Sequence, residues 1–501
     1  MDIFQHLMQG FSAIFTPYNL WMAVVGCFFG TIVGILPGLG PSATIAMLLP
    51  FTFGMNATPA MIMLCALYYG AKFGGSTTSI LINVPGENAS VVTTFDGYQM
   101  ALQGRAGSAL GISAIGSFVG GILGTFGLIF VAVPLAEFSL KFGPAEYFSL
   151  IVMGLLTIVF VGGKSIPKSL ISGVFGLALG TIGSDVVQGA PRFVYGVAEL
   201  MDGISFVVVV MGVFGIGEVL VSAEEHMKMD SIKVPFSKLW PSLSDLFQSR
   251  WAMLRGTIIG FIIGVLPGAG STIASFISYG VEKSTSKHPE RFGKGAIEGV
   301  AGPETANNAS CSGEMVPLLG LGIPGSGSTA VMLGALMIYG LRPGPMLFKT
   351  NPDFVWTLIA SLFVGNVILL IMNLPLVPLF AYTLRLSYSF LYPAIILVCM
   401  TGVYSVNSNV FDVWAMLIFG ILGYFMKKYD IPGAPMIIGL VLGPLLEHSL
   451  YKALALAHGD VTVFIIRPIS AILLGIAAAM TIVVLFKTAR AMRKQVSDDQ
   501  N

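Results

Sequence analysis

Charged residues are scarce in this chain. Of its 501 residues, 10% are Asp, Glu, Lys or Arg and 55% are hydrophobic, whereas a soluble domain has about 25% charged residues. Four long stretches contain no Asp, Glu, Lys or Arg: 3–71, 106–136, 256–281 and 354–384. A helix needs about 20 apolar residues to cross the hydrocarbon core. The composition therefore excludes a soluble protein and predicts an all-α polytopic membrane protein, with about 10–14 membrane segments.

Several chemical signatures are also missing. The four cysteines, Cys27, Cys65, Cys311 and Cys399, stand singly in apolar segments, so we expect small core residues rather than disulfides or metal ligands. The five histidines form no HExxH pair, and no GxxxxGK[ST] phosphate loop occurs. A net charge of +1 gives no reason to expect a nucleic-acid partner. We therefore predict neither an enzyme nor a bound metal or cofactor.

A proline–glycine motif occurs twice. Residues 34–40 read GILPGLG, and residues 264–270 read GVLPGAG, which is a displacement of 230 residues. Proline removes a helix hydrogen bond, and glycine adopts backbone conformations that other residues avoid. Each motif should therefore break a helix within an apolar environment.

Further matches extend this repeat. Residues 83–86 (NVPG) correspond to 322–325 (GIPG) at an offset of 239, and residues 189–191 (GAP) correspond to 433–435 at an offset of 244. Their order and nearly constant spacing predict two repeated halves. The expected parts are a first repeat at 1–222, a polar amphipathic linker at 223–250, a second repeat at 251–487 and a cytoplasmic tail at 488–501.

The relation between the halves depends on the number of crossings. If each half crosses the membrane an odd number of times, the two halves have opposite orientations, as in many secondary transporters. This inverted arrangement is our working expectation. Residues 256–281 can form a re-entrant hairpin of two half-helices, each about 11 residues and 16 Å long, or one long broken crossing. The sequence leaves both open. The basic run Lys487, Arg490, Arg493 and Lys494 predicts a cytoplasmic C-terminus.

Four stretches combine glycine or proline with polar side chains inside apolar sequence: 37–44, 72–88, 267–272 and 303–329. Broken helices at membrane depth expose N–H groups that attract anions and carbonyl groups that coordinate cations. We expect a binding site for a small carboxylate where the four stretches meet. Its predicted substrate-binding residues are Gly38, Gly40, Ser42, Thr44, Lys72, Ser76, Thr77, Thr78, Asn83, Gly268, Gly270, Ser271, Thr272, Asn307, Asn308, Ser326, Ser328 and Thr329, and its predicted ion-coupling residues are Glu304 and Glu314.

Each of these residues also has a structural explanation. Small hydroxyl residues are common where transmembrane helices pack closely. Lys72 can contact a substrate carboxylate or extend its amine to the membrane surface from a helix end, and Glu87 reads as a loop residue facing water. Asp460 and Arg467 are expected to form an ion pair that fixes the loop before the last helix.

The motif blocks resemble a known family. They are GILPGLGPSATIAMLLPFTF (34–53), YYGAKFGGSTTSILINVPGENASVVTTFDGYQMALQGRAG (68–107), GVLPGAGSTIASFISY (264–279), PLLGLGIPGSGSTAVMLGAL (317–336) and GDVTVFIIRPIS (459–470). The sequence resembles the large transmembrane subunit of the tripartite tricarboxylate transporter family (TctA-type) over nearly its whole length.

This resemblance implies a secondary active transporter of the bacterial inner membrane. Its implied partners are a small multi-helix membrane subunit (TctB-type) and a periplasmic solute-binding protein (TctC-type), besides membrane lipid. The implied substrates are di- and tricarboxylates such as citrate, taken up with Na⁺ or H⁺ rather than with ATP. The residues themselves leave alternatives to a secondary transporter, namely a passive channel or a membrane scaffold and, least favoured, an intramembrane enzyme.

Overall fold

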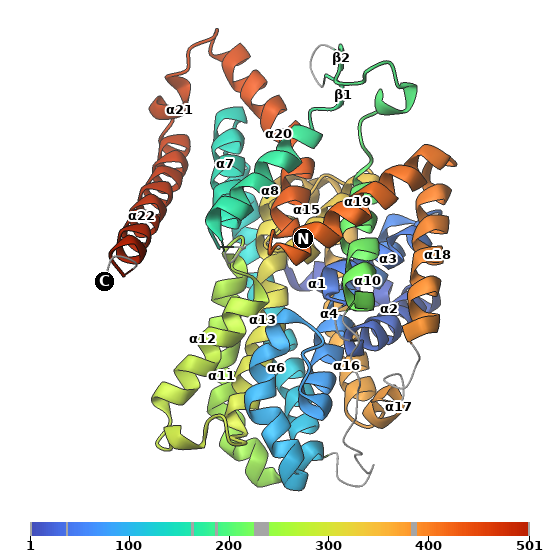
Figure 1. Ribbon diagram of the computed structural model, residues 1–501, viewed down its shortest axis with the longest axis vertical. Helices are drawn as coiled ribbons and strands as arrows, with labels where there is room; N and C mark the ends of the chain where they lie inside the picture. The colour runs from blue at the N-terminus through green and yellow to red at the C-terminus, as the bar shows by residue number, and fades with distance from the viewer. Residues whose placement is uncertain are drawn as a thin grey trace. The chain divides into compact units, whose positions relative to one another are not determined.

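The computed structural model describes residues 3–36, 39–161, 165–185, 189–224, 240–381 and 388–498. These ranges are almost entirely helical (Figure 1), which confirms the all-α prediction. The sheet found in them is one short antiparallel pair, β1 (Gly183–Ser184) with β2 (Pro191–Arg192). Of the predicted linker and tail, residues 225–239 and 499–501 lie outside the described residues.

The helices are bounded as follows. The first half of the chain contains α1 (Ile3–Ile14), α2 (Pro17–Ile35), α3 (Pro41–Leu48), α4 (Ala57–Ile82), α5 (Val91–Thr93), α6 (Ala106–Ser139), α7 (Pro144–Val161), α8 (Ile166–Leu179), α9 (Phe206–Val210) and α10 (Gly217–Glu224). The second half contains α11 (Leu243–Val265), α12 (Gly270–Thr285), α13 (Glu298–Leu321), α14 (Gly327–Ile338), α15 (Pro345–Thr350), α16 (Pro352–Asn373), α17 (Val377–Ala381), α18 (Tyr388–Asn407), α19 (Val410–Lys428), α20 (Gly433–Leu456), α21 (Val463–Ile466) and α22 (Pro468–Asp498).

Shorter helical turns connect these elements. They are the 3₁₀ turns η1 (Leu49–Thr52), η2 (Asn88–Ser90), η5 (Ala198–Leu200) and η8 (Pro289–Arg291), and the π turns η3 (Thr94–Tyr98), η4 (Ala101–Arg105) and η6 (Met211–Ile216).

Length and hydropathy make this a multi-pass membrane protein. Among the described residues, 6 helical segments are long and apolar enough to cross a bilayer: Pro17–Ile35, Ala101–Ser139, Phe206–Glu224, Pro352–Asn373, Val410–Lys428 and Gly433–Leu456. Shorter apolar helices of 10–17 residues occur as well, among them Pro41–Thr52 and Gly327–Ile338. Such half-length helices are common in transporters, where discontinuous helices line the substrate site.

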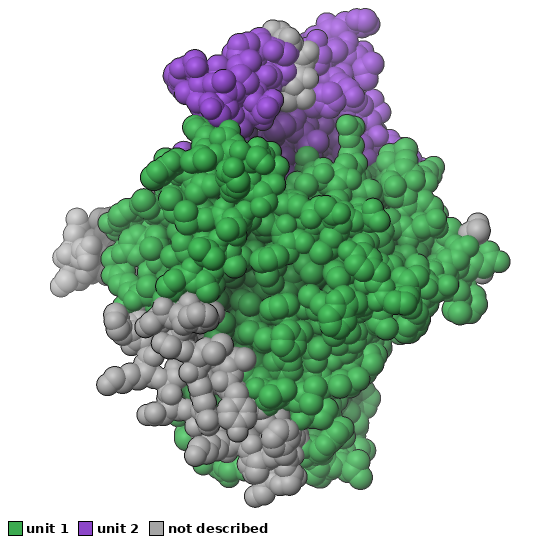
Figure 2. All heavy atoms as spheres, turned by 90° about the vertical axis from the view of Figure 1, so that its right-hand side faces the viewer, with its two compact units in different colours: residues 1–137, 205–429 green, residues 138–204, 430–501 purple. Residues whose placement is uncertain are grey.

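The chain forms two compact units, coloured differently in Figure 2. Unit 1 comprises residues 1–137 and 205–429, and unit 2 comprises 138–204 and 430–501. In unit 2, α20 packs against α7 and α8, and α22 packs against α7. In unit 1, α4 and α13 are buried along nearly their whole length, which makes them the core of that unit.

Glycines at every fourth position of α2 let it approach α4. A Cβ atom on Gly26, Gly30 or Gly34 would lie only 2.4, 2.6 and 2.4 Å from the carbonyl oxygens of Met63, Leu67 and Ala71, respectively. Only glycine permits this backbone approach, which is the small-residue contact typical of membrane helices.

The pair α11 and α13 repeats the same contacts. A Cβ on Gly256, Gly260 or Gly264 would lie 2.4, 2.3 and 2.4 Å from the carbonyl oxygens of Gly302, Ala306 and Ser310. Each glycine is displaced by 230 residues from its counterpart on α2, and each carbonyl by 239 from its counterpart on α4. The same offsets that the motifs show in the sequence therefore recur in the packing, so the helix pairs α2–α4 and α11–α13 are structurally repeated.

The second motif turns the chain back on itself. Helix α11 ends at Val265, α12 begins at Gly270, and both helices pack against α13. Arg255 Nε lies 2.8 Å from Glu282 Oε1, so residues at similar distances on either side of the break face each other. Residues 256–281 thus form a helical hairpin rather than one broken helix, which decides between the two alternatives that the sequence left open.

Candidate functional site

A buried ion pair lies at the centre of unit 1. Lys72, on α4, has only 4% of its surface exposed. Its Nζ atom donates to Glu87 Oε2 at 2.5 Å and to Ser271 Oγ at 2.5 Å. The other oxygen of Glu87, Oε1, accepts a hydrogen bond from Asn307 Nδ2 at 2.8 Å. Three of the four polar stretches therefore meet at this pair: the second supplies both of its members, and the third and fourth supply Ser271 and Asn307.

The structure excludes one of the two alternatives for Lys72, and the expectation for Glu87 was wrong. Lys72 does not extend from a helix end, because it lies in the interior of α4 and is buried. Glu87 does not face water, because it is 6% exposed and paired with Lys72. A buried charge needs a partner of opposite sign, and each residue supplies the partner of the other.

The backbone around Glu87 explains its position. Helix α4 ends at Asn83 in the left-handed conformation, with φ of 58°. The chain then turns through Pro85 and Gly86, and Glu87 caps η2 through reciprocal hydrogen bonds with Ser90. A Cβ on Gly75 would lie 2.8 Å from Glu87 Cγ, so the absence of a side chain there makes room for the carboxylate.

A second buried carboxylate lies on α13. Glu314 Oε2 accepts hydrogen bonds from Tyr68 Oη at 2.8 Å and from Ser326 Oγ at 2.5 Å. Ser326 is the N-cap of α14, where it also pairs with Thr329 in a capping box. Glu314 Oε1 is buried and has no hydrogen-bond partner among the described residues.

A third buried carboxylate, Glu304, is surrounded by hydroxyl groups. Its Oε2 accepts from Ser76 Oγ at 2.5 Å and from Ser117 Oγ at 3.4 Å, and its Oε1 accepts from Thr93. The amide of Asn308 donates to the Glu304 carbonyl oxygen at 3.2 Å. Hydroxyl donors stabilise a buried carboxylate without a counter-charge.

Residues that follow each break contact the other half of the chain. Near the start of α3, Ser42 Oγ lies 3.1 Å from Ser328 Oγ on α14. Near the start of α12, Ser271 contacts Lys72 on α4. The residues after each break therefore make polar contacts with the other half of the chain, and Ser271 joins the Lys72–Glu87 pair.

Comparison with known proteins identifies the family. The model of the tripartite tricarboxylate transporter TctA family matches residues 20–438. This chain belongs to the TctA family. An uncharacterized 52.8 kDa protein of Agrobacterium vitis, described as lying in the TAR-I ttuC' 3' region, is 47% identical over 496 residues, which is 99% of each chain.

Two further relatives cover less of the TctA chain. An uncharacterized protein in the TAR-II ttuC' 3' region of Agrobacterium vitis is 47% identical over 237 residues, 98% of its own length and 47% of this chain. An uncharacterized protein of Methanocaldococcus jannaschii is 27% identical over 174 residues, 42% of its length and 32% of this chain. No solved structure matches the chain.

The structure brings together part of the predicted site. Lys72, Ser76, Ser271, Asn307, Asn308, Glu304, Glu314 and Ser326 make the contacts described above, and Ser42 and Ser328 contact each other. Gly40 caps α3 and Thr44 bonds to its carbonyl at 3.1 Å, while the Gly268 amide donates to the Gly325 carbonyl at 2.8 Å. Gly270 begins α12 with φ of 63°.

Other predicted residues lie apart or have structural contacts. Asn83 is exposed and ends α4, and Thr272 is half-buried on α12. Thr77 is buried in α4, Thr78 bonds to the Gly75 carbonyl at 3.1 Å, and Thr329 caps α14. Gly38 lies outside the described residues. Their predicted substrate-binding roles remain predictions.

The sequence analysis missed several polar residues of the cluster. Tyr68 lies one helical turn before Lys72, which is the signal that could have identified it as facing the same side. Thr93 and Ser117 contact Glu304 from segments without a glycine–proline break. Asp96 is also buried, and it accepts hydrogen bonds from Tyr279 and from the amides of Gly293, Gly295 and Ala296.

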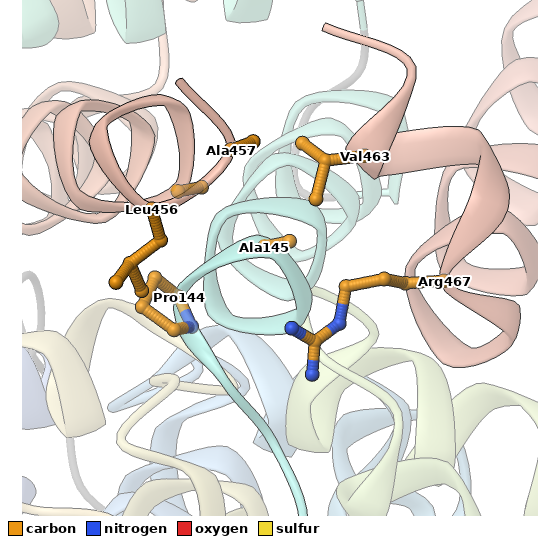
Figure 3. A pocket seen from close by; sticks show the side chains of 7 residues that line it. Pro144, Ala145, Leu456, Ala457, Val463 and Arg467 are labelled. Atoms are coloured by element: carbon orange, nitrogen blue, oxygen red, sulfur yellow. The ribbon is translucent and has the colours of Figure 1, made fainter. Parts of the chain in front are cut away.

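Unit 2 of the TctA chain contains a small pocket outside this cluster (Figure 3). It is lined by Pro144, Ala145, Ala453, Leu456, Ala457, Val463 and Arg467. The expected Asp460–Arg467 pair was wrong, because Arg467 Nε lies 2.6 Å from Glu146 Oε1 and Asp460 accepts hydrogen bonds from Thr462. The pocket offers one basic group among apolar side chains, and we assign it no role.

Proposed function

We propose that this chain is the translocating subunit of a secondary active uptake system for small carboxylates. The observation that supports it is the ion pair of Lys72 in the core of unit 1. Lys72 is the one buried Lys or Arg among the described residues. In a membrane protein, a buried ionisable group marks a functional pathway by default, because its burial is costly.

The Lys72–Glu87 contact suggests how a carboxylate would bind. Glu87 is itself a carboxylate held by an ammonium group and by the amide of Asn307. A substrate carboxylate has the same chemistry and would replace Glu87 at Lys72. Binding by exchange keeps Lys72 paired, because an unpaired buried ammonium group would cost several kcal/mol. The displaced Glu87 would have to take up a proton or move into water to avoid the same cost.

The tripartite family supports the remaining parts of the proposal. A periplasmic solute-binding protein would deliver a di- or tricarboxylate to this subunit in the inner membrane, next to a small membrane subunit. A Na⁺ or H⁺ gradient would drive accumulation, with Glu304 and Glu314 as candidate ion-coupling residues. The C-terminus would lie in the cytoplasm, following the positive-inside tendency.

Reconstitution with both partner subunits tests this function. The proteoliposomes should accumulate radiolabelled citrate or a related carboxylate above its outside concentration under an imposed Na⁺ or H⁺ gradient, without ATP. Lys72→Met should reduce uptake by about tenfold or more, because it removes the anion-binding charge. Lys283→Met, at an exposed position near the end of α12, should transport like the unmodified protein.

Two outcomes would contradict the proposal. Downhill flux that never exceeds the outside concentration would indicate a passive channel. Full accumulation by Lys72→Met would show that the substrate does not need this charge.

A further inference from the structure

The two repeats place a carboxylate in corresponding positions but attach it to different residues. At the offset of 239, Gly75 corresponds to Glu314, and Glu87 corresponds to Ser326. A Cβ on Gly75 would lie 2.8 Å from Glu87 Cγ. Because Gly75 corresponds to Glu314, the Glu87 side chain of the first half lies next to the position that corresponds to the Glu314 side chain of the second half. The acid of the first half, Glu87, is the N-cap of η2, and the acid of the second half, Glu314, lies on α13.

The correspondence of these residues is fixed by backbone contacts. A Cβ on Gly74 would lie 2.4 Å from the carbonyl oxygen of Thr31, and a Cβ on Gly313 would lie 2.6 Å from that of Phe261. The two glycines are 239 residues apart, and the two carbonyls are 230 apart. Gly74 on α4 and Gly313 on α13 are therefore equivalent positions, and so are the residues that follow them, Gly75 and Glu314.

The cation of the first half is not repeated. Lys72 corresponds to Cys311, which is neutral, and whose Sγ contacts the Asn307 carbonyl oxygen at 3.4 Å. In the first half the ammonium group neutralises Glu87. In the second half, no positively charged group of the described chain forms an ion pair with Glu314. The positive charge near it is the same Lys72 ammonium group, which lies 5.7 Å from the ring of Tyr68 but pairs with Glu87, so one ammonium group serves two buried carboxylates.

The carboxylate of Glu314 is also incompletely bonded. It is 0% exposed. Glu314 is the one fully buried acid among the described residues with a carboxylate oxygen that lacks a hydrogen-bond partner. Asp96, equally buried, has donors on both oxygens. An unpaired buried carboxylate oxygen costs free energy unless a donor or a cation meets it.

The unpartnered oxygen faces the break between α11 and α12. A Cβ on Gly270, the first residue of α12, would lie 4.0 Å from Glu314 Oε1. Carboxylate, hydroxyl and carbonyl oxygens are the ligands that hard cations prefer. The break leaves N–H groups free at the start of α12 and carbonyl groups free at the end of α11, which is Val265. Freed carbonyl groups at broken membrane helices can coordinate Na⁺.

We propose that Glu314 binds an exchangeable Na⁺. In the second half this ion neutralises the buried carboxylate, as the Lys72 ammonium group does for Glu87 in the first half. The proposal rests on the proposed transport function and names its coupling ion and its place. One carboxylate is neutralised by a cation built into the chain and the other by a cation from solution. Bound Na⁺ also lowers the repulsion between Glu314 and an anionic substrate near Lys72, so each ligand should favour binding of the other.

The test measures binding of radiolabelled Na⁺ to the purified full-length chain in lipid nanodiscs. The unmodified protein should bind Na⁺, and Glu314→Gln should weaken binding by about tenfold or more, because the amide keeps the shape but removes the charge. Cys311→Lys should also abolish Na⁺ binding by placing an ammonium group beside Glu314. The matched variant Cys311→Ser adds no charge and should bind Na⁺ normally.

A second readout is the melting temperature in Na⁺ compared with choline. Na⁺ should raise it in the unmodified protein and in Cys311→Ser but not in Glu314→Gln, because a ligand that binds only the folded state stabilises it. Unchanged Na⁺ affinity in Glu314→Gln would overturn the site, even if Cys311→Lys does not fold. An unmodified protein that binds no Na⁺, with Glu314 binding a proton instead, would overturn it as well.

The transport assay separates this inference from the proposed function. Na⁺ binding through Glu314 without any gradient-driven carboxylate uptake would contradict the proposed function and leave the Na⁺ site standing. Uptake with normal Na⁺ dependence in Glu314→Gln would contradict the site and leave the function standing.

Discussion

At the scale of single residues, the polar cluster of unit 1 depends on a few buried charges. Lys72 and Glu87 form an ion pair. Ser271 at the start of α12 accepts a hydrogen bond from Lys72, and Asn307 on α13 donates one to Glu87. Both side chains are nearly inaccessible to water. Such a pair contributes little net stability when intact, but removal of one partner leaves an uncompensated buried charge.

Removal of one charge from this pair should destabilise the protein more than removal of both. Glu87→Gln leaves Lys72 without its counter-charge, so we expect a loss of about 3–5 kcal/mol, which the double variant Lys72→Met/Glu87→Leu should largely recover. The measurement is a double-mutant cycle on melting temperatures in nanodiscs. Glu290→Gln removes an exposed acid as a control and should change stability by less than about 0.5 kcal/mol. Equal melting temperatures for Glu87→Gln and the unmodified chain would disprove the coupling.

The residues of this pair show where sequence reasoning reached its limit. Polar stretches around the breaks could be identified, because polar residues in apolar sequence are unusual. The burial of Glu87 could not be predicted, since an acid that follows a proline–glycine turn normally lies in water. Its burial depends on the missing side chain of Gly75 and on Asn307, which is 220 residues away in the chain.

At the scale of elements, helix contacts rather than the breaks alone define the repeat. The helix pairs α2–α4 and α11–α13 meet through glycines at every fourth position. The sequence predicted the breaks because proline and glycine act locally. The direction of the chain after each break could not be predicted, because it depends on long-range contacts such as Arg255 with Glu282.

A methyl group at this helix contact should disrupt unit 1. Gly260→Ala places a Cβ 2.3 Å from the Ala306 carbonyl oxygen, and overpacking of this kind costs about 1–3 kcal/mol. We expect a lower melting temperature and less protein recovered from the membrane. Gly280→Ala, on α12 with nothing within 4 Å of the new atom, should be neutral or stabilising by up to about 1 kcal/mol. The same loss in both variants would argue against a specific helix contact.

At the scale of the whole molecule, our working expectation is that the two halves have opposite orientations in the membrane, which requires an odd number of crossings in each half. Asn56 precedes α4, and Lys287 follows α12 at nearly the equivalent place in the second repeat. Basic residues around Lys287 predict that this loop is cytoplasmic. If the halves are inverted, the loop at Asn56 lies on the periplasmic side.

Cysteine labelling from each side tests the inverted arrangement. Asn56→Cys should react with an impermeant maleimide added to intact cells, whereas Lys287→Cys should react only after the inner membrane is opened. Both positions are exposed, and the native residues Cys27, Cys65, Cys311 and Cys399 are buried and should give little background. Labelling of both introduced cysteines from the same side would show that the halves run parallel.

The contacts between the two halves have an evolutionary consequence. Ser42 near the start of α3 contacts Ser328, and Ser271 near the start of α12 contacts Lys72, so polar contacts after both breaks join one half to the other. In an ancestor that carried a single copy, these contacts could form only between two molecules. Gene duplication and fusion would then have converted the interface of a homodimer into the interior of one chain, and freed its two copies to diverge in charge.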